Sequence, residues 1–331
     1  MAAALQLAAG AALALAVLAR ARGRRRAALP RELAEMLAAA RLAGREIRAS
    51  WLARLDAGRG PMDAAGGGAG DVAIKVGNSA DLQTEVDRRC EDIVVAHLRR
   101  AFPQHAFVGE EATSSGSPGS VTRAATFVID PIDGTTNFVH TCLGCSVLVA
   151  LMVDREVRAG VILDPIHGEC FYAWLGGGAW LQRLDDSLED LPAPPLRLRT
   201  TGERALERAM VATDVGHHRS AGPVQRCLEL QRELLVGGKV RGMRVIGGCG
   251  LGLAYVAAGR FDAYVELHSP WVWDFAAGSL IVNEAGGKAC NPLTGGSIDW
   301  DKRDILAAAS PALADTLVKL VTGNKVLATQ V

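Results

Sequence analysis

The sequence predicts an α/β fold, because stretches with the apolar spacing of helices alternate with short apolar runs typical of strands. Four strand-like runs follow one another from Ser146 to Leu181 with short turns between them, which predicts an antiparallel meander. After an acidic, Pro-rich connection at 185–195, helices and strands alternate to the end. With 331 residues, one large domain or two closely packed halves is expected.

The individual elements follow from local patterns. Apolar residues recur every three or four positions from residue 30 to a helix end near Gly58, and a second helix covers about 81–101. The Gly-rich residues 58–71 predict a mobile loop. Short apolar runs predict strands at 107–111, 126–130 and 261–267, and an Ala/Gly-rich helix covers 273–287.

Composition excludes two classes of protein. The chain has 36 Lys+Arg, 36 Asp+Glu and 49% hydrophobic residues, so it is no disordered polyelectrolyte. Five of the arginines lie within residues 1–30, which contain no acid. Without these five, 31 basic residues stand against 36 acidic ones, a net charge of −5. The body is therefore mildly acidic, and no nucleic-acid partner is expected.

The N-terminal segment predicts a membrane anchor or a targeting signal. Residues 2–19 are apolar except for Gln6, and a helix of this length reaches about 27 Å, a borderline membrane span. The arginines of residues 20–26 follow the apolar run, whereas in a secretory signal peptide the charge precedes it. We expect residues 1–30 to anchor the protein with its body facing the cytosol, with an organelle transit peptide or an unstructured leader as alternatives. Residues 31–331 then form the functional domain.

Seven cysteines, an odd number without regular spacing, predict a reducing compartment. Cys142 and Cys145 form a single C-x-x-C motif beside His140, and packed thiols are a better interpretation than a zinc or redox site. His217 and His218 are interpreted as a solvated pair. The run GCGLG at 248–252 imitates a dinucleotide fingerprint, but no strand–turn–helix unit with a following acid is predicted around it.

Carboxylates at element boundaries are the informative feature. Asp130 closes a buried strand, and Asp133 follows across a tight turn just before a Thr-Thr-Asn run that opens a helix. Two carboxylates beside a helix N-terminus suit divalent cations held against a phosphate, although Asp-Gly is also a common turn dipeptide. Glu110 and Glu111 follow another apolar run, with solvated loop acids as the alternative. Asp274 lies in a first helical turn, where it could be a cap.

Three segments, GEE at 109–111, DPIDGTTNF at 130–138 and WDFAAGSLIVNEAGG at 273–287, resemble the inositol monophosphatase family of Mg²⁺-dependent, Li⁺-sensitive phosphomonoesterases. The similarity spans about residues 31–320. It implies a layered αβαβα sandwich of the inositol monophosphatase and fructose-bisphosphatase type. It also implies a homodimer with two or three Mg²⁺ per subunit.

The resemblance assigns roles to individual residues of this chain. The metal ligands would be Glu110, Asp130, the carbonyl of Ile132, Asp133 and Asp274, with Glu111 beside them. Asp87 and Thr135 would orient the attacking water, and the N–H groups of Gly134 and Thr135 would bind the phosphate. The substrate would further contact Ile132, Asp133, Asp274, Glu266 and the segment Gly247, Gly248, Cys249.

Several positions depart from the family pattern. The segment 140–146 reads HTCLGCS where a Phe-Pro element is usual, and Gly248 stands where Ser or Thr is common. Seven residues separate Glu266 from Asp274, about one more than usual. Lys75 matches a family lysine near the third metal, with a spacing off by about one. These departures fall on the pocket that selects the substrate.

The resemblance therefore implies Mg²⁺-dependent hydrolysis of a small polyol or sugar phosphomonoester, with inositol monophosphate as the default substrate. Histidinol phosphate and L-galactose 1-phosphate are alternatives. The absence of G-x-S-x-G and P-loop motifs agrees with attack by metal-activated water rather than a covalent phospho-enzyme. From another class, a catalytically silent membrane-tethered binding protein is possible, but such a protein would be expected to lose a ligand, and all are present.

Overall fold

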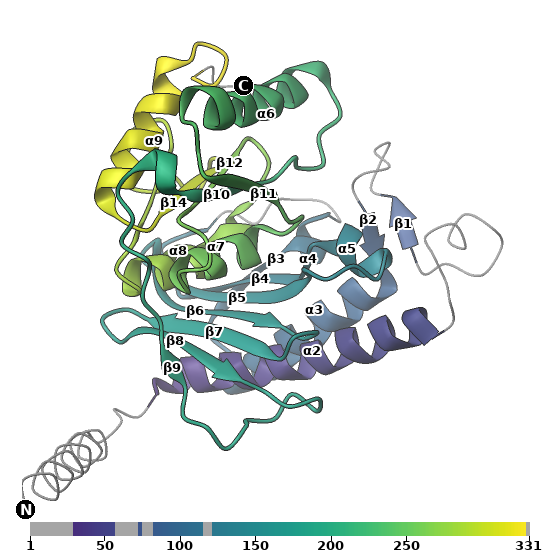
Figure 1. Ribbon diagram of the computed structural model, residues 1–331. Helices are drawn as coiled ribbons and strands as arrows, with labels where there is room; N and C mark the ends of the chain where they lie inside the picture. Colours follow the sequence, from purple (N-terminus) through teal and green to yellow (C-terminus); the bar gives the residue numbers. More distant parts are fainter. Residues whose placement is uncertain (1–28, 57–71, 75–81, 115–120, 329–331) are drawn as a thin grey trace, which may run out of the picture. The chain divides into compact units, whose positions relative to one another are not determined.

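The computed structural model describes residues 29–56, 72–74, 82–114 and 121–328 (Figure 1). The predicted anchor at 2–19, the predicted loop at 58–71 and Lys75 lie outside these residues. None of the helices within the described ranges is long and apolar enough to cross a membrane. The elements below all belong to one unit, Glu32–Val331, apart from the first residue of the first helix.

The larger sheet has seven strands in the order β3-β4-β5-β6-β7-β8-β9. The first pair is parallel and every later pair is antiparallel. The strands are β3 (Ala106–Gly109), β4 (Thr126–Asp133), β5 (Ser146–Val153), β6 (Glu156–Asp164), β7 (Glu169–Trp174), β8 (Gly178–Arg183) and β9 (Leu196–Arg197). The antiparallel meander predicted between Ser146 and Leu181 is confirmed.

Two long helices cover one face of this sheet, α2 (Arg31–Asp56) and α3 (Glu85–Ala101). Their apolar stripes pack on side chains such as Ile129, Val149 and Val161 in one buried cluster. The helix predicted to start near residue 81 begins at Glu85, because Thr84 caps it and residues before it form a strand. That strand, β2 (Leu82–Thr84), pairs antiparallel with β1 (Val72–Ile74).

A second pair of helices, α7 (Cys249–Ala257) and α8 (Val272–Glu284), lies between the two sheets. Both are buried on nearly every side, which is why their sequences are apolar all round. Gly160 of β6 is part of this contact, since a Cβ there would lie 2.8 Å from the carbonyl oxygen of Ala277. The helix predicted at 273–287 is thus confirmed as α8, ending three residues earlier.

The smaller sheet has five strands in the order β11-β10-β12-β14-β13. β10 is parallel to β11 and to β12, whereas β14 is antiparallel to both of its neighbours. The strands are β10 (Met210–Thr213), β11 (Gly242–Val245), β12 (Ala263–Leu267), β13 (Lys288–Cys290) and β14 (Asp304–Ala308). The strand predicted at 261–267 is β12.

The outer face of the smaller sheet packs on α6 (Ala221–Arg232) and α9 (Pro311–Gly323). The remaining elements are short: α4 (Glu110–Ser114), α5 (Thr135–Val139), a 3-10 turn (Leu206–Arg208) and a π-helical turn (Glu233–Gly237). The layers therefore run helices, sheet, helices, sheet, helices, as Figure 1 shows. This is the αβαβα sandwich that the resemblance implies, and it agrees with the α/β class predicted from the sequence patterns.

Candidate metal and phosphate site

The end of β4 is irregular, and this irregularity shapes the candidate site. The pairing of β4 with β5 shifts between Asp130 and Asp133, so the strand bulges over Pro131 and Ile132. The carboxylate of Asp130 accepts the N–H of Ile132 at 3.0 Å, which fixes the bulge. Both aspartates are buried. The two predicted ligands therefore end one strand and face the same region.

Gly134 makes the turn from this strand into α5. Its φ is +83°, in the left-handed region, and a Cβ would lie 2.5 Å from the carbonyl oxygen of Gly144. The Asn137 amide donates to the carbonyl oxygens of Gly144 at 3.0 Å and of Ile246 at 2.8 Å. The predicted helix opening at Thr135 is confirmed, with its first-turn N–H groups unpaired inside the helix as in any helix N-terminus.

Asp133 is tied to the N-terminus of α7. Its two carboxylate oxygens accept the N–H of Cys249 at 3.1 Å and of Gly250 at 2.9 Å, and the hydroxyl of Ser146 donates at 3.3 Å. The GCGLG run does lie in a strand–turn–helix unit, β11–turn–α7, contrary to the sequence interpretation. In this structure the carboxylate of Asp133 accepts the N–H groups at the N-terminus of α7, the position at which a dinucleotide phosphate would bind.

Asp87 and Thr135 are brought together as predicted, at 3.3 Å between Oδ1 and Oγ1. The Thr135 hydroxyl also lies 3.0 Å from the carbonyl oxygen of Ile132, and its one proton serves a single acceptor at a time. Asp87 itself is fully buried and accepts the N–H and the hydroxyl of Thr84, which caps α3. The helix start therefore fixes the carboxylate that faces Thr135.

Glu110 and Glu111 begin α4 instead of ending a strand, because β3 stops at Gly109. Glu91, which sequence reasoning missed, accepts the N–H of Glu111 at 2.8 Å and of Ala112 at 2.9 Å. Burial raises the pKa of Glu91, and these two N–H groups oppose the shift. Its position four residues after Asp87, on the same buried face of α3, was the available signal.

Asp274 lies in the first turn of α8, where its Oδ2 accepts the N–H of Trp271 at 2.6 Å. Burial, then the charges of Glu110 and Asp133, raise the pKa of Asp274 well above its usual range. For Asp130 the causes are burial and the charges of Glu110, Asp274 and Asp133, together with a side-chain hydrogen bond to Asp274. Without a cation, such a bond between two carboxyl groups requires one of them to hold a proton.

These carboxylates fit a divalent cation by their chemistry. All are hard oxygen donors, and neighbouring carboxylates help to raise the pKa of Asp130 and of Asp274, an effect that a bound cation would oppose. Within the described ranges, no group of three or more His, Cys, Asp or Glu side chains is already arranged to hold a metal ion. Asp133 and Asp274 direct oxygens at backbone N–H groups, although each oxygen keeps a second lone pair. Metal ligation at these residues remains a prediction.

The predicted substrate residues adjoin these carboxylates. Glu266 on β12 is buried, and the hydroxyl of Tyr264 donates to its Oε2 at 2.5 Å. Burial and then the charge of Asp214 raise the pKa of Glu266 to about 8. Asp214, also missed in the sequence, follows β10 and accepts the N–H of Val215 at 2.7 Å. Burial raises the pKa of Asp214, and nearby backbone N–H groups, that of Val215 first, oppose the shift.

The structure also places the C-x-x-C motif and the His217–His218 pair, to which the sequence analysis assigned no catalytic role. Cys145 is buried, as a packed thiol would be, but Cys142 is exposed, so the interpretation of both cysteines as packed thiols is wrong for Cys142. The interpretation of His217 and His218 as solvated was incomplete, because both are half-buried with their rings 4.4 Å apart. Nε2 of His217 lies 3.5 Å from the guanidinium of Arg303.

Comparison with known proteins gives a consistent set of relatives. The model of the inositol monophosphatase family matches residues 33–325. Inositol monophosphatase 2 of Solanum lycopersicum is 37% identical over 246 residues, 74% of this chain and 87% of that protein. Inositol monophosphatase 2 of Homo sapiens is 36% identical over 239 residues, 72% and 77% respectively. The structure of extragenic suppressor protein suhB from Bartonella henselae matches with a TM-score of 0.69 at 30% identity, covering 86% of this chain and 96% of that one.

Proposed function

Because the chain belongs to the inositol monophosphatase family, whose members are phosphoric monoester hydrolases, we propose that it hydrolyses inositol monophosphate. The observation that carries the proposal is the convergence of the buried Asp130 and Asp133 at the end of β4 with the half-buried Asp274 of α8. After burial, the charges of Glu110, Asp274 and Asp133 raise the pKa of Asp130, and those of Glu110 and Asp133 raise the pKa of Asp274. A site of this kind suits a cationic cofactor and an anionic substrate together.

Mg²⁺ is the proposed cofactor, two or three ions per subunit, held by Glu110, Asp130, the Ile132 carbonyl, Asp133 and Asp274. When bound, it would supply Lewis-acid activation of water and compensate charge on the leaving oxygen. The other steps belong to the chain's own groups. Asp87 holds the Thr135 hydroxyl at 3.3 Å, so the Thr135 oxygen is oriented to accept a proton from an attacking water. The N–H groups of Gly134, which precedes α5, and of Thr135, its first residue, would bind the phosphate oxygens.

Substrate choice would depend on the residues around the N-terminus of α7. Glu266 offers a carboxyl group whose pKa is about 8, able to donate or accept a hydrogen bond with a polyol hydroxyl. Gly248 has no side chain where relatives often carry a hydroxyl, and a Cβ there would lie 3.0 Å from Asp133 Oδ2. A polyol or sugar hydroxyl could therefore approach this turn closely.

The test is phosphate release by the purified full chain from inositol 1-phosphate, histidinol phosphate and L-galactose 1-phosphate, each with and without Mg²⁺. We expect Mg²⁺-dependent release with the highest kcat/KM for inositol 1-phosphate. A higher kcat/KM for one of the other two compounds would change the proposed substrate but leave the proposed reaction unchanged. If none of the three compounds releases phosphate in a Mg²⁺-dependent way, the proposal of an enzyme is refuted and a catalytically silent binding protein is favoured.

Three finer properties are also proposed. Inhibition by Li⁺ and a homodimer rest on the resemblance, and attachment to a membrane or targeting to an organelle rests on the apolar and Arg-rich sequence of residues 1–30. Li⁺ titration of the activity and light scattering of the purified chain test the first two. Co-sedimentation of the full chain with membranes, compared with a chain lacking residues 1–30, tests the third.

A further inference from the structure

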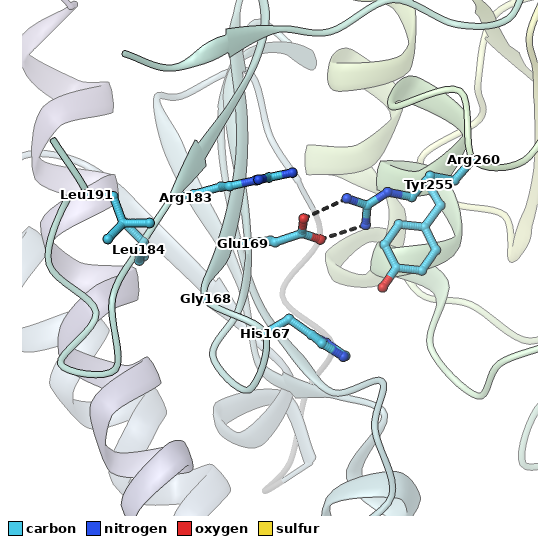
Figure 2. A pocket seen from close by; sticks show the side chains of 8 residues that line it. All are labelled: His167, Gly168, Glu169, Arg183, Leu184, Leu191, Tyr255 and Arg260. Carbon is cyan, nitrogen blue, oxygen red and sulfur yellow. Dashed lines mark hydrogen bonds and ion pairs between the residues drawn. The ribbon is translucent and has the colours of Figure 1, made fainter. Parts of the chain in front are cut away.

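A pocket lies at the opposite end of α7 from Asp133. Its volume is about 410 Å³, within the range of small-molecule sites. It is lined by the turn between β6 and β7, the end of β8, and residues at and after the end of α7. Figure 2 shows the side chains of Arg183, Glu169 and Arg260 pointing toward one another across it, with His167 and Tyr255 beside them.

The charges in this pocket are unbalanced. Arg260 holds both oxygens of Glu169, at 2.6 Å each, and its guanidinium lies 4.8 Å from the ring centroid of Tyr255. Glu169 on β7 also lies directly opposite Arg183 on β8. Oppositely charged side chains at facing positions of two strands usually form an ion pair. With Glu169 engaged by Arg260, Arg183 makes no ion pair with any residue that the structure describes. The pocket lining thus holds two guanidinium groups and one carboxylate, and among the described residues that carboxylate pairs with Arg260 alone.

His167 adds a polar group of fixed orientation. Its Nδ1 lies 2.7 Å from Oδ2 of Asp164, which is fully buried. The other oxygen of Asp164 accepts the N–H groups of Ile166 and His167, at 2.9 Å each. Gly168 keeps this turn tight, because its φ is +64° and a Cβ would lie 2.7 Å from the Leu184 carbonyl oxygen. The wall of the pocket is therefore built before any ligand arrives.

We propose that this pocket is a second ligand site, for a small organic anion whose carboxylate or phosphate group binds between Arg183 and Arg260. Guanidinium groups bind both kinds of oxyanion through paired, charge-assisted hydrogen bonds. An anion there competes with Glu169 for Arg260, and so weakens the link between β7 and the chain that follows α7. The other end of α7 donates two N–H groups to Asp133. Occupancy of the pocket thereby changes the position of Asp133.

The binding test uses the full chain freed of metal with a chelator, titrated calorimetrically with succinate and separately with inorganic phosphate. We expect one of the two probes to saturate a single site in the wild type. The Arg183→Gln variant should bind that probe with a Kd at least about tenfold higher. Arg158→Gln is the matched control, because Arg158 is exposed on the same sheet and pairs with Glu156 away from the pocket. Asp133→Asn keeps the affinity, which separates this site from the catalytic one.

Three outcomes overturn the site: no saturable binding of either probe, equal affinity in Arg183→Gln and wild type, or loss in Arg241→Gln instead. Arg241 lines a different cavity, of about 420 Å³. Saturation by succinate alone assigns a carboxylate ligand, and saturation by phosphate alone assigns a phosphorylated one.

The coupling through α7 rests on the proposed function, so it has its own measurement. With Mg²⁺ in excess, the saturating probe changes kcat in the wild type and in Arg158→Gln, but not in Arg183→Gln. The readout is kcat because phosphate, the product of the proposed reaction, would raise KM in every variant by competing with substrate. An unchanged kcat in the wild type overturns the coupling. If no turnover is found at all, the proposed function fails while the titration result for the pocket stands.

Discussion

The carboxylate of Asp133 accepts the backbone N–H of Gly250 at 2.9 Å, joining residues 117 positions apart in the chain. This bond ties the end of β4 in the larger sheet to the first turn of α7 between the sheets. Asp133 is therefore oriented by a helix N-terminus, where a negative charge is favoured. Burial nevertheless dominates and raises the pKa of Asp133 to about 7.

Gly250→Ala should separate these two residues. An added Cβ would lie 3.0 Å from Asp133 Oδ2 and 2.4 Å from Leu148 Cδ2. We expect about 1–3 kcal/mol lower unfolding free energy and a loss of phosphatase activity larger than the loss of folded protein explains. Urea denaturation and phosphate release measure the two effects. Gly222→Ala on α6 is the control, because its Cβ meets nothing within 4 Å and both quantities should stay near wild type.

Asp133→Asn should lower kcat by about 100-fold or more, since it removes one negative charge of the proposed cation site. The asparagine side chain has one oxygen and one NH2 group, and the NH2 group cannot accept a hydrogen bond. One of the two N–H groups, of Cys249 or Gly250, therefore loses its acceptor, and we expect the unfolding free energy to fall by about 1–3 kcal/mol. The melting temperature of the wild type should rise with Mg²⁺, and that of the variant should rise much less. Asp186→Asn, at an exposed surface acid, is the control. Turnover like the wild type would contradict the assigned site.

The elements that the sequence predicted well have a strong local signal. The meander of β5 to β8 followed from apolar runs with short turns, and α8 from a long apolar stretch after an N-terminal acid. Gly134 marked the turn into α5 because Asp-Gly favours positive φ. Asp130 and Asp133 could be placed together because only a tight turn separates them.

The connections between distant segments left no local signal. Glu91 contacts α4 from the middle of α3, and its charge looks like that of any helix acid in the sequence. The strand β11 has only four residues, too few for a period to show, so the unit around Gly250 was not recognised. The sequence pattern puts Glu110 inside a strand at 107–111 because a five-residue helix is shorter than the window that detects one.

Gly134→Ala should cost more than the left-handed backbone alone explains. Gly134 and Gly176 have similar φ values, +83° and +76°, but a Cβ at Gly134 would lie 2.5 Å from the Gly144 carbonyl oxygen, and at Gly176 it meets nothing within 4 Å. Gly176→Ala should lower the unfolding free energy by about 1–2 kcal/mol, the usual penalty for that conformation. Gly134→Ala should exceed this and abolish activity. Equal unfolding free energies of Gly134→Ala and Gly176→Ala would show that the backbone at Gly144 can move away from the added Cβ without loss of stability.

Glu229 predicts a specific acid dependence of stability. Hydrogen bonds from Arg232, and then from Asn324 after α9, lower the pKa of Glu229 from 4.5 to about 2. The unfolded chain therefore takes up the proton first as pH falls, so this stabilisation is complete above about pH 4.5 and disappears toward pH 2. Glu229→Gln should be less stable than wild type at pH 6 and approach it near pH 2.

Urea unfolding of both proteins at a series of pH values measures that difference. The control is Glu156→Gln, which removes an exposed carboxylate from an ion pair with Arg158 on β6. Its stability difference from wild type should stay small at every pH. A Glu229→Gln difference that does not shrink in acid would mean that packing, rather than charge, joins α6 to the chain after α9.

Glu91→Gln should act on the cofactor rather than on the chemical step. Glu91 accepts two N–H groups at the start of α4, and Gly109 has no room for a side chain because a Cβ would lie 2.5 Å from Glu91 Oε2. A glutamine loses one of these acceptors and loosens the helix that carries Glu110. The Mg²⁺ concentration for half-maximal activity should rise several-fold, about 1 kcal/mol of binding, while kcat at saturating Mg²⁺ stays near wild type. Glu85→Gln, on the same helix and exposed, should change neither. A fall in kcat that excess Mg²⁺ does not restore would instead place Glu91 in the reaction itself.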